Sequence, residues 1–281
     1  MRLEKWQALG NDYLIAERDA LGLTLTPPRV RRLCDRHTGP GADGVLLLQP
    51  ADEPGFVARL RVFNPDGSEA ELSGNGAREA VLYLHRRGWT PGRTFSIQTV
   101  AGELRATIAD ERSARVDMGR ARLRSADFPG GGDSGAGRLP DGTAFQHISI
   151  GNPQCAIHVG DTQTLAALDL PALGPPIEHA SLFPNRTNIS WWTALDARTV
   201  RARIFERGVG ETRSSGTGAT GAAVAHVLRG CDSPVTVVLD GGELEVEVGE
   251  DFHVDLTGWA EPVYAAELSG ELARALEAEE P

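Results

Sequence analysis

The chain of 281 residues is long enough for two domains of ordinary size. Hydrophobic residues make up 41% and charged residues 24%, a globular composition, and no stretch approaches the roughly 18 apolar residues that a membrane span needs. The formal net charge of −11 opposes nucleic-acid binding, because contact with phosphates depends on an excess of Lys and Arg. We therefore expect no membrane and no nucleic-acid partner, and a small molecule as the ligand.

The N-terminal residues lack the apolar core and cleavage site of a secretory signal, so we expect a cytoplasmic protein. Three scattered cysteines, Cys34, Cys155 and Cys231, favour neither a disulfide framework nor a zinc site, and we expect no metal. Cys34 and Cys231 are expected to be small core residues.

An internal repeat organises the chain. The sequence SGNGA at residues 73–77 recurs as SGTGA at 215–219, an offset of about 142 residues. Three further matches keep nearly the same offset and order: Gly10-Asn11 with Gly151-Asn152, Glu69 with Glu211, and residues 102–104 with 242–244. The repeat predicts two structurally similar halves.

We expect an N-terminal half at 1–120 and a C-terminal half at 145–265. The intervening residues 121–144 contain a Gly-rich run that is typical of a linker or a mobile loop. Residues 266–281 are rich in Ala and Glu, and we expect an acidic tail that frays or forms a loose helix packed on the N-terminal half.

Each half repeats one pattern of predicted elements. Residues 59–63 and 200–205 alternate polar and apolar side chains, as half-buried strands do. Each leads through the Gly-rich turn into an apolar helix, over 77–84 and 219–228, and further strands such as 243–248 follow. The fold class is therefore α+β. We expect two pseudo-symmetric domains, each a strand-rich shell around a central buried helix, with the ligand cleft between them.

The Gly-rich turns are candidate anion sites, because a helix N-terminus presents unpaired backbone N–H groups and a positive dipole end. For a single turn, a serine that caps the helix is the simpler interpretation. Two matching turns can instead hold one carboxylate, with Ser73 and Ser215 on either side. Asn64 and Glu206, each nine residues before its serine, favour a ligand site. Such a site suits proton transfer at a stereocentre.

These motifs resemble diaminopimelate epimerase over nearly the whole chain. The matching segments are residues 10–13, 39–44, 64–70 with 74–76, 151–153, 183–188, and 206–212 with 216–219. The resemblance implies the two-domain fold, no pyridoxal phosphate or other cofactor, and a two-base mechanism with one thiol on each side of the α-carbon. It also implies that, beside Glu206, these residues hold an amino-acid-like carboxylate: Asn11, Asn64, Gly74, Asn75, Asn152, Asn188, Arg207, Gly216 and Thr217.

The chain departs from the family pattern at the catalytic positions. Ser73 and Ser215 stand where the family has its two cysteines, and Gln154 stands where it has a histidine that supports one thiol. A serine hydroxyl ionises far less readily than a thiol, and the Gln154 amide is no base. Glu206 remains, and we expect Ser73, Ser215 and Glu206 to form the catalytic set.

Two other side chains near Gln154 are poor substitutes. Cys155 is its neighbour on a predicted strand and therefore points to the opposite face. His158 lies on the same face but about 13 Å along the strand.

Three hypotheses stay open. The first is that the chain is a divergent isomerase or cyclase that moves a proton. The second is that it is a diaminopimelate epimerase whose cysteines were changed to serine to trap a complex. The third is that it is a non-catalytic amino-acid-binding protein. The loss of histidine at Gln154 argues against the trapped enzyme, because trapping would leave that position alone. The oligomeric state stays open, a homodimer included.

Overall fold

The computed structural model describes residues 1–279, which form two compact units. The first unit comprises Met1–Val116 with the C-terminal segment that starts at Gly258, and the second comprises Asp117–Thr257. Among the described residues, no helix is both long and apolar enough to cross a membrane.

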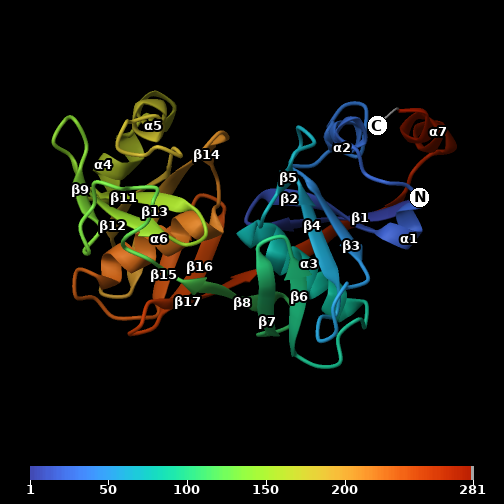
Figure 1. Ribbon diagram of the computed structural model, residues 1–281, viewed down its shortest axis with the longest axis horizontal. Coiled ribbons are helices and arrows are strands. Elements are labelled where there is room, and N and C mark those ends of the chain that lie inside the picture. The colour runs from blue at the N-terminus through green and yellow to red at the C-terminus, as the bar shows by residue number, and fades with distance from the viewer. Residues whose placement is uncertain (280–281) are drawn as a thin grey trace. The chain divides into compact units, whose positions relative to one another are not determined.

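The first unit is a mostly antiparallel sheet around one helix. Its strands are β1 (Arg2–Ala8), β2 (Asn11–Glu17), β3 (Val45–Gln49), β4 (Arg59–Phe63), β5 (Glu69–Ala70), β6 (Thr94–Thr99), β7 (Gly102–Ile108), β8 (Ser113–Arg120) and β18 (Glu261–Glu267). They pair in the order β18-β1-β2-β3-β4-β6-β7-β8, with parallel pairs only at β2–β3 and β4–β6 among those described. The helix α3 (Gly74–Arg86) packs against β1, β2, β3 and β7 (Figure 1).

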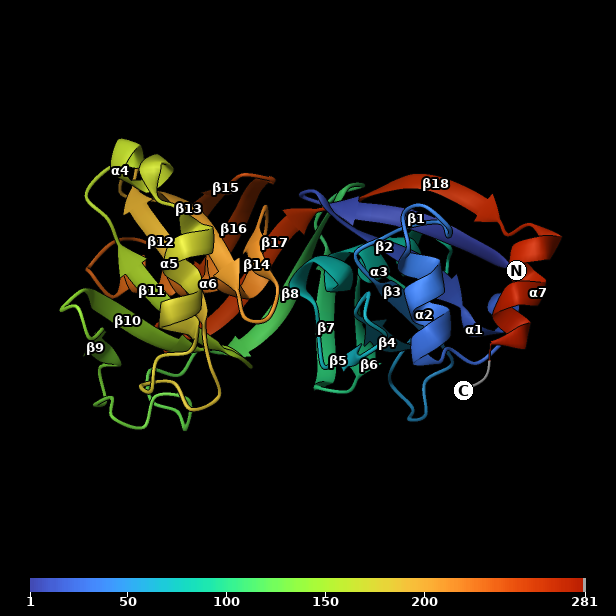
Figure 2. The same ribbon diagram turned by 90° about the horizontal axis from the view of Figure 1, so that it is seen from above.

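The second unit has the same construction. Its strands are β9 (Ala136–Arg138), β10 (Ala144–Ser149), β11 (Pro153–His158), β12 (Asn188–Ala194), β13 (Thr199–Glu206), β14 (Gly210–Thr212), β15 (Val235–Leu239), β16 (Gly242–Val248) and β17 (His253–Trp259). They pair in the order β9-β10-β11-β12-β13-β15-β16-β17, with parallel pairs at β11–β12 and β13–β15. The central helix is α6 (Gly216–Val227), which packs against β10 to β13, β15 and β16 (Figure 2).

The two units therefore repeat one strand order and one pattern of parallel pairs. Each central helix follows the short hairpin β4–β5 or β13–β14 and precedes the strand that pairs in parallel with β4 or β13. The expected fold class, α+β with two pseudo-symmetric domains around buried helices, is confirmed.

The glycines in the middle of the two turns allow each helix to lie close to the sheet behind it. A Cβ atom at Gly76 would lie 2.9 Å from Leu46 Cδ2, and one at Gly218 would lie 2.8 Å from Ile204 Cγ2. Carbon atoms do not approach so closely in a packed core. The repeated glycine thus reflects helix-to-sheet packing that both units share.

Five more helices are described. The first unit has α1 (Arg18–Leu21), α2 (Pro27–Cys34) and α7 (Gly270–Ala278), and the second has α4 (Thr162–Ala167) and α5 (Leu170–Glu178). Leu276 of α7 is fully buried in the hydrophobic cluster that also contains Val30 and Leu33 of α2. The tail thus contributes to the core of the first unit as far as residue 279, and its last two residues lie outside the described part of the chain.

Residues 121–144, which we expected as a linker or loop, belong to the second unit. Phe128 and Leu139 are buried in its hydrophobic cluster, and Phe128 packs against Phe145 with ring centroids 5.2 Å apart. β9 lies within this segment and pairs with β10. The glycines there connect buried anchor residues.

Candidate functional site

Each Gly-rich turn is capped by its serine. Ser73 Oγ accepts a hydrogen bond from the Gly76 N–H at 3.1 Å, and Ser215 Oγ accepts one from the Gly218 N–H at 3.1 Å. Both serines have extended backbone angles, as capping residues do. The capping role is therefore present in both units, and it fixes each hydroxyl at the N-terminus of its helix.

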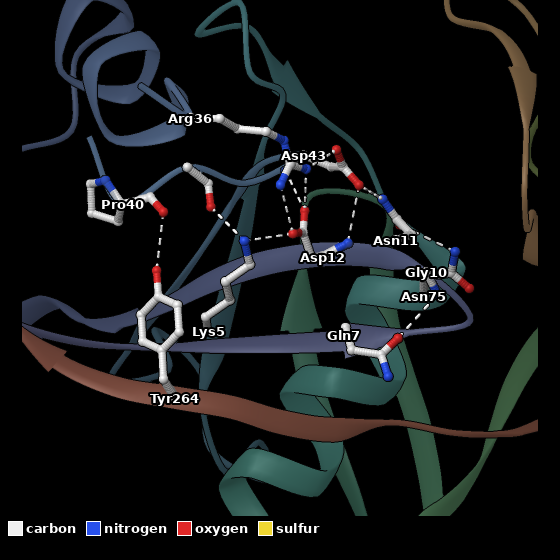
Figure 3. A network of polar contacts seen from close by, with 11 residues as sticks. Lys5, Gln7, Gly10, Asn11, Asp12, Arg36, Pro40, Asp43, Asn75 and Tyr264 are labelled. Atoms are coloured by element: carbon white, nitrogen blue, oxygen red, sulfur yellow. Dashed lines mark hydrogen bonds and ion pairs between the residues drawn. The ribbon is translucent and has the colours of Figure 1, made fainter. Parts of the chain in front are cut away.

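A directional chain of hydrogen bonds leads away from the first turn (Figure 3). Arg78 is fully buried and donates to Asn75 Oδ1 at 2.6 Å. Asn75 Nδ2 donates to Asn11 Oδ1 at 3.1 Å, and Asn11 Nδ2 donates to Asp43 at 3.0 Å. Because a guanidinium only donates and a carboxylate only accepts, the two ends determine how both asparagine amides are oriented.

The carboxylates at the end of this chain are held by two cations. Arg36 donates to Asp12 at 2.7 Å and to Asp43 at 2.8 Å, and Lys5 lies 2.6 Å from Asp12 (Figure 3). Burial alone would raise the pKa of Asp12, but the hydrogen bonds from Arg36 and Lys5 lower it to about 2. This cluster ties β2 to the loop before β3 and keeps Asn11 in place.

Asn64 takes no part in that chain. Its Nδ2 donates to Ser68 Oγ at 3.0 Å within the turn that joins β4 to β5, and its backbone N–H donates to the Ser68 carbonyl. The structure thus joins Asn11 and Asn75 in one network and leaves Asn64 in its own turn.

In the second unit, Glu206 at the end of β13 is the acid beside the turn. Burial raises the pKa of its carboxyl group, and a hydrogen bond from the Ser215 side chain lowers it by less. The net effect is a carboxylate that binds a proton more readily than an ordinary glutamate. Such a group, in contact with a hydroxyl at a helix N-terminus, is suited to accept a proton.

Asn152, Gln154 and Thr217 form the polar neighbours of this turn. Gln154 Nε2 donates to Asn152 Oδ1 at 2.6 Å, and Asn152 Nδ2 donates to Thr217 Oγ1 at 3.2 Å. Gln154 is fully buried on β11, and its Oε1 accepts no hydrogen bond from any described residue. Position 154 therefore orients Asn152 and supplies no titratable group.

Asn188 and Arg207 meet through the backbone. Asn188 Oδ1 accepts from the Arg207 N–H at 2.8 Å, and its Nδ2 donates to the Pro153 carbonyl at 3.2 Å. The Arg207 side chain donates to the Asn185 carbonyl at 2.8 Å. Glu178 accepts from the Gly208 N–H at 3.0 Å and so anchors the loop that follows Glu206.

The thiols and the histidine near the second turn do not take the place of the missing groups. Cys155 is buried in the hydrophobic cluster of the second unit, where burial raises the pKa of its thiol well above the usual range. His158 is exposed and stacks edge-on against Trp192. Cys34 is buried as expected, but Cys231 is only half-buried, because it lies in the loop after α6.

Sequence reasoning did not assign roles to Tyr13, Asp43, Arg78 or Glu178. Tyr13 donates from its hydroxyl to Ser73 Oγ at 3.1 Å, although β2 and α3 are distant in sequence. Tyr13 and Asp43 lie within the matched motifs, which was the available signal. Arg78 sits one turn of helix after Gly74, while nothing in the local sequence marks Glu178.

The polar side chains at the two turns indicate which kind of ligand they suit. Within residues 1–279, no three His, Cys, Asp or Glu side chains are grouped as metal ligands. The polar groups at both turns are amides, hydroxyls and one carboxylate, which suit an organic ligand with a carboxylate of its own.

The family model for diaminopimelate epimerase matches residues 4–124 and 146–262. A protein of Nostoc sp. named diaminopimelate epimerase 2 is 39% identical over 280 residues, which span 97% of each chain. A diaminopimelate epimerase of Pelotomaculum thermopropionicum is also 39% identical over 280 residues, covering 95% of this chain and 98% of that one.

Solved structures share the fold at low sequence identity. A phenazine biosynthesis protein of Bacillus anthracis matches with a TM-score of 0.68 and 18% identity over 96% of this chain and 99% of that one. A hydroxyproline epimerase of Agrobacterium vitis, with trans-4-hydroxy-L-proline bound, matches with a TM-score of 0.65 and 16% identity over 95% and 91%. These two likenesses support the fold.

Proposed function

Since the chain belongs to the diaminopimelate epimerase family, we propose that it is a cofactor-independent isomerase that moves a proton on an amino-acid-like carboxylate. The family and its relatives indicate an isomerase. We propose further that its proton transfer does not use thiols. This second step rests on the hydrogen bond between Ser215 and Glu206.

The proposed base is Glu206 acting with Ser215. The Ser215 hydroxyl donates to the Glu206 carboxylate, and burial raises the pKa of that carboxyl group. In the proposed step a C–H bond breaks, the proton passes to Ser215 Oγ, and the Ser215 proton passes to Glu206. Direct transfer to Glu206 conserves atoms and charge equally well. Either route replaces a thiolate by a carboxylate that has a raised proton affinity.

In each unit, the Gly-rich turn and the asparagine beside it are proposed to bind a carboxylate of the ligand. Helix N-termini at Gly74 and Gly216 favour a negatively charged carboxylate. In each unit an asparagine at the turn between two paired strands contacts a residue of the Gly-rich turn: Asn11, between β1 and β2, contacts Asn75, and Asn152, between β10 and β11, contacts Thr217.

The substrate should carry a more acidic C–H bond than a free amino acid does. Ser73 and Ser215 stand at the two thiol positions, and a serine hydroxyl is a far weaker acid than the thiol it replaces, so neither serine ionises to a base without help. Diaminopimelate, whose name the relatives carry, is therefore a poor substrate for this chain. A carboxylate whose carbanion is stabilised by a neighbouring carbonyl or double bond fits the weaker base better.

A non-catalytic amino-acid-binding protein is the second candidate. It is favoured by the retention of the oriented amides of Asn11, Asn75 and Asn152 while both thiols are absent. The raised pKa of Glu206 speaks for catalysis, because a binding protein has no use for a poised base.

Hydrogen exchange in heavy water tests the proposal. The protein is incubated with a panel of amino acids and unsaturated or oxo carboxylates, and mass spectrometry measures deuterium next to the carboxylate. We expect incorporation into at least one carboxylate, reduced about 10²-fold or more by Glu206→Gln. Glu211→Gln is the matched control, because Glu211 lies in the same segment but pairs with Arg203 at 2.6 Å. Tight binding without exchange for every carboxylate would establish the binding protein instead.

A further inference from the structure

Tyr13 marks a difference between the two turns. We propose that Tyr13 is a positioning residue that makes the Ser73 hydroxyl a proton donor. This inference rests on the proposed function. It adds an assignment of acid and base to the two serines, which occupy equivalent positions in the repeat.

The Ser73 hydroxyl can donate one further hydrogen bond but has no free lone pair with which to accept one. Its Oγ accepts from the Gly76 N–H at 3.1 Å and from the Tyr13 hydroxyl at 3.1 Å. A hydroxyl has two acceptor lone pairs and one donor hydrogen, so these two contacts occupy its acceptor capacity. An oxygen in this state donates to a ligand and does not take a proton from it.

The Tyr13 ring is buried and closely packed beside Gly44. Its side chain is 7% exposed, and a Cβ atom added at Gly44 would lie 2.5 Å from the ring carbon Cε1. The same Cβ would lie 2.4 Å from the Phe63 carbonyl oxygen, so the backbone there cannot yield cheaply. Gly44 lies in the segment 39–44, and its lack of a side chain makes room for the Tyr13 phenol that reaches Ser73.

Ser215 is in the opposite state. Its Oγ accepts from the Gly218 N–H at 3.1 Å, and its own proton is donated to the Glu206 carboxylate. One acceptor lone pair remains, and an anionic group stands ready to take the proton. The second turn therefore carries the base.

The proton balance follows from these contacts. At the first turn the Ser73 O–H bond breaks as the proton goes to the substrate carbanion, and Tyr13 transfers its hydroxyl proton to Ser73 Oγ. The negative charge then lies on the Tyr13 phenolate. With an ordinary pKa of about 10, a phenol stabilises this charge far better than a serine hydroxyl does. Exchange with water then returns a proton to Tyr13 and removes the proton that Glu206 has taken, so both groups regain their starting states. An enzyme that rests with one base and one acid starts turnover from one stereoisomer of its substrate.

The contact can be tested without turnover, with a thiol as a probe at each serine position. Ser73→Cys is placed in a Cys231→Ser background, where the remaining cysteines, Cys34 and Cys155, are buried. The pKa of the thiol at position 73 is read from the pH dependence of its alkylation by iodoacetamide. Tyr13→Phe is then added, and Ser215→Cys with and without Tyr13→Phe is the matched control.

We expect Tyr13→Phe to raise the pKa of the thiol at position 73, with about tenfold less thiolate at pH 7, because a hydrogen bond to a charged group is lost. The thiol at position 215 should be unaffected. An unchanged pKa at position 73, in protein with a native circular dichroism spectrum, would overturn the assignment of Tyr13. A Tyr13 effect in a protein that exchanges no carboxylate proton would instead refute the proposed function alone.

Discussion

Gln154 donates from Nε2 to Asn152 Oδ1 across 2.6 Å. The contact uses the amide of a fully buried side chain on β11, against which α6 packs so closely that a Cβ atom at Gly221 would lie 3.0 Å from Gln154 Cβ. Position 154 thus orients the candidate substrate-binding residue Asn152, whereas the resemblance implies a histidine there that supports one thiol.

The first prediction restores that histidine. In a variant with Ser73→Cys and Ser215→Cys, we expect Gln154→His to raise the rate of α-proton exchange about tenfold or more, because an imidazole beside the second turn supplies a general base. The measurement is deuterium incorporation into diaminopimelate. Gln154→Met fills similar space without a titratable group and should give no gain, so an equal gain from methionine would contradict a role in proton transfer.

The second prediction concerns the network around Asp12. Its pKa of about 2 lies below the ordinary value of 3.8, so the ionised form stabilises the fold above pH 4, and this contribution disappears as the pH falls toward 2. Asp12→Asn should lower the free energy of unfolding by about 2 kcal/mol at pH 7. The difference from wild type should shrink between pH 4 and pH 2.

Urea unfolding followed by circular dichroism across this pH range gives the measurement. Asp19→Asn on the exposed surface of α1 is the control, with an expected change within about 0.5 kcal/mol. A loss for Asp12→Asn that is the same at pH 2 and pH 7 would show that the ion pairs with Lys5 and Arg36 do not produce it.

The third prediction concerns pH and Glu206. Burial raises the pKa of this carboxyl group, and a base must be deprotonated to act. The rate of proton exchange should therefore fall on the acid side at a pH above the ordinary value for glutamate. The slope of the rate against pH, measured with any substrate found in the carboxylate panel, checks this. A rate that stays flat down to the ordinary pKa of glutamate would remove Glu206 from the role of base.

Much of the fold could be predicted because its signals are local or repeated. The spacing of apolar residues and the two Gly-rich turns predicted helices at 77–84 and 219–228, and the structure has α3 and α6 over Gly74–Arg86 and Gly216–Val227. The repeat predicted two similar halves because sequence matches kept their order. The burial of Phe128, just before the Gly-rich run, could not be foreseen, because the composition of a segment does not show which residues it packs against.

The candidate site could be predicted less well, because its contacts join residues far apart in the chain. Tyr13 reaches Ser73 only because β2 and the start of α3 meet in the folded unit, with Gly44 leaving space for the ring. The hydrogen bond between Asn11 and Asp43 likewise depends on the parallel pairing of β2 with β3. The motifs identified the candidate site residues, but only the three-dimensional structure shows their hydrogen-bond partners.

The most direct test of the central claim, that serines at positions 73 and 215 make this chain a divergent member of its family, is deuterium exchange into diaminopimelate in heavy water. Wild type and the variant with Ser73→Cys and Ser215→Cys are compared by mass spectrometry at equal protein concentration. We expect negligible exchange by wild type and measurable exchange by the double variant, because helix N-termini lower the pKa of both new thiols. Exchange by wild type at an ordinary enzyme rate, roughly 1 to 10³ per second, would contradict the claim.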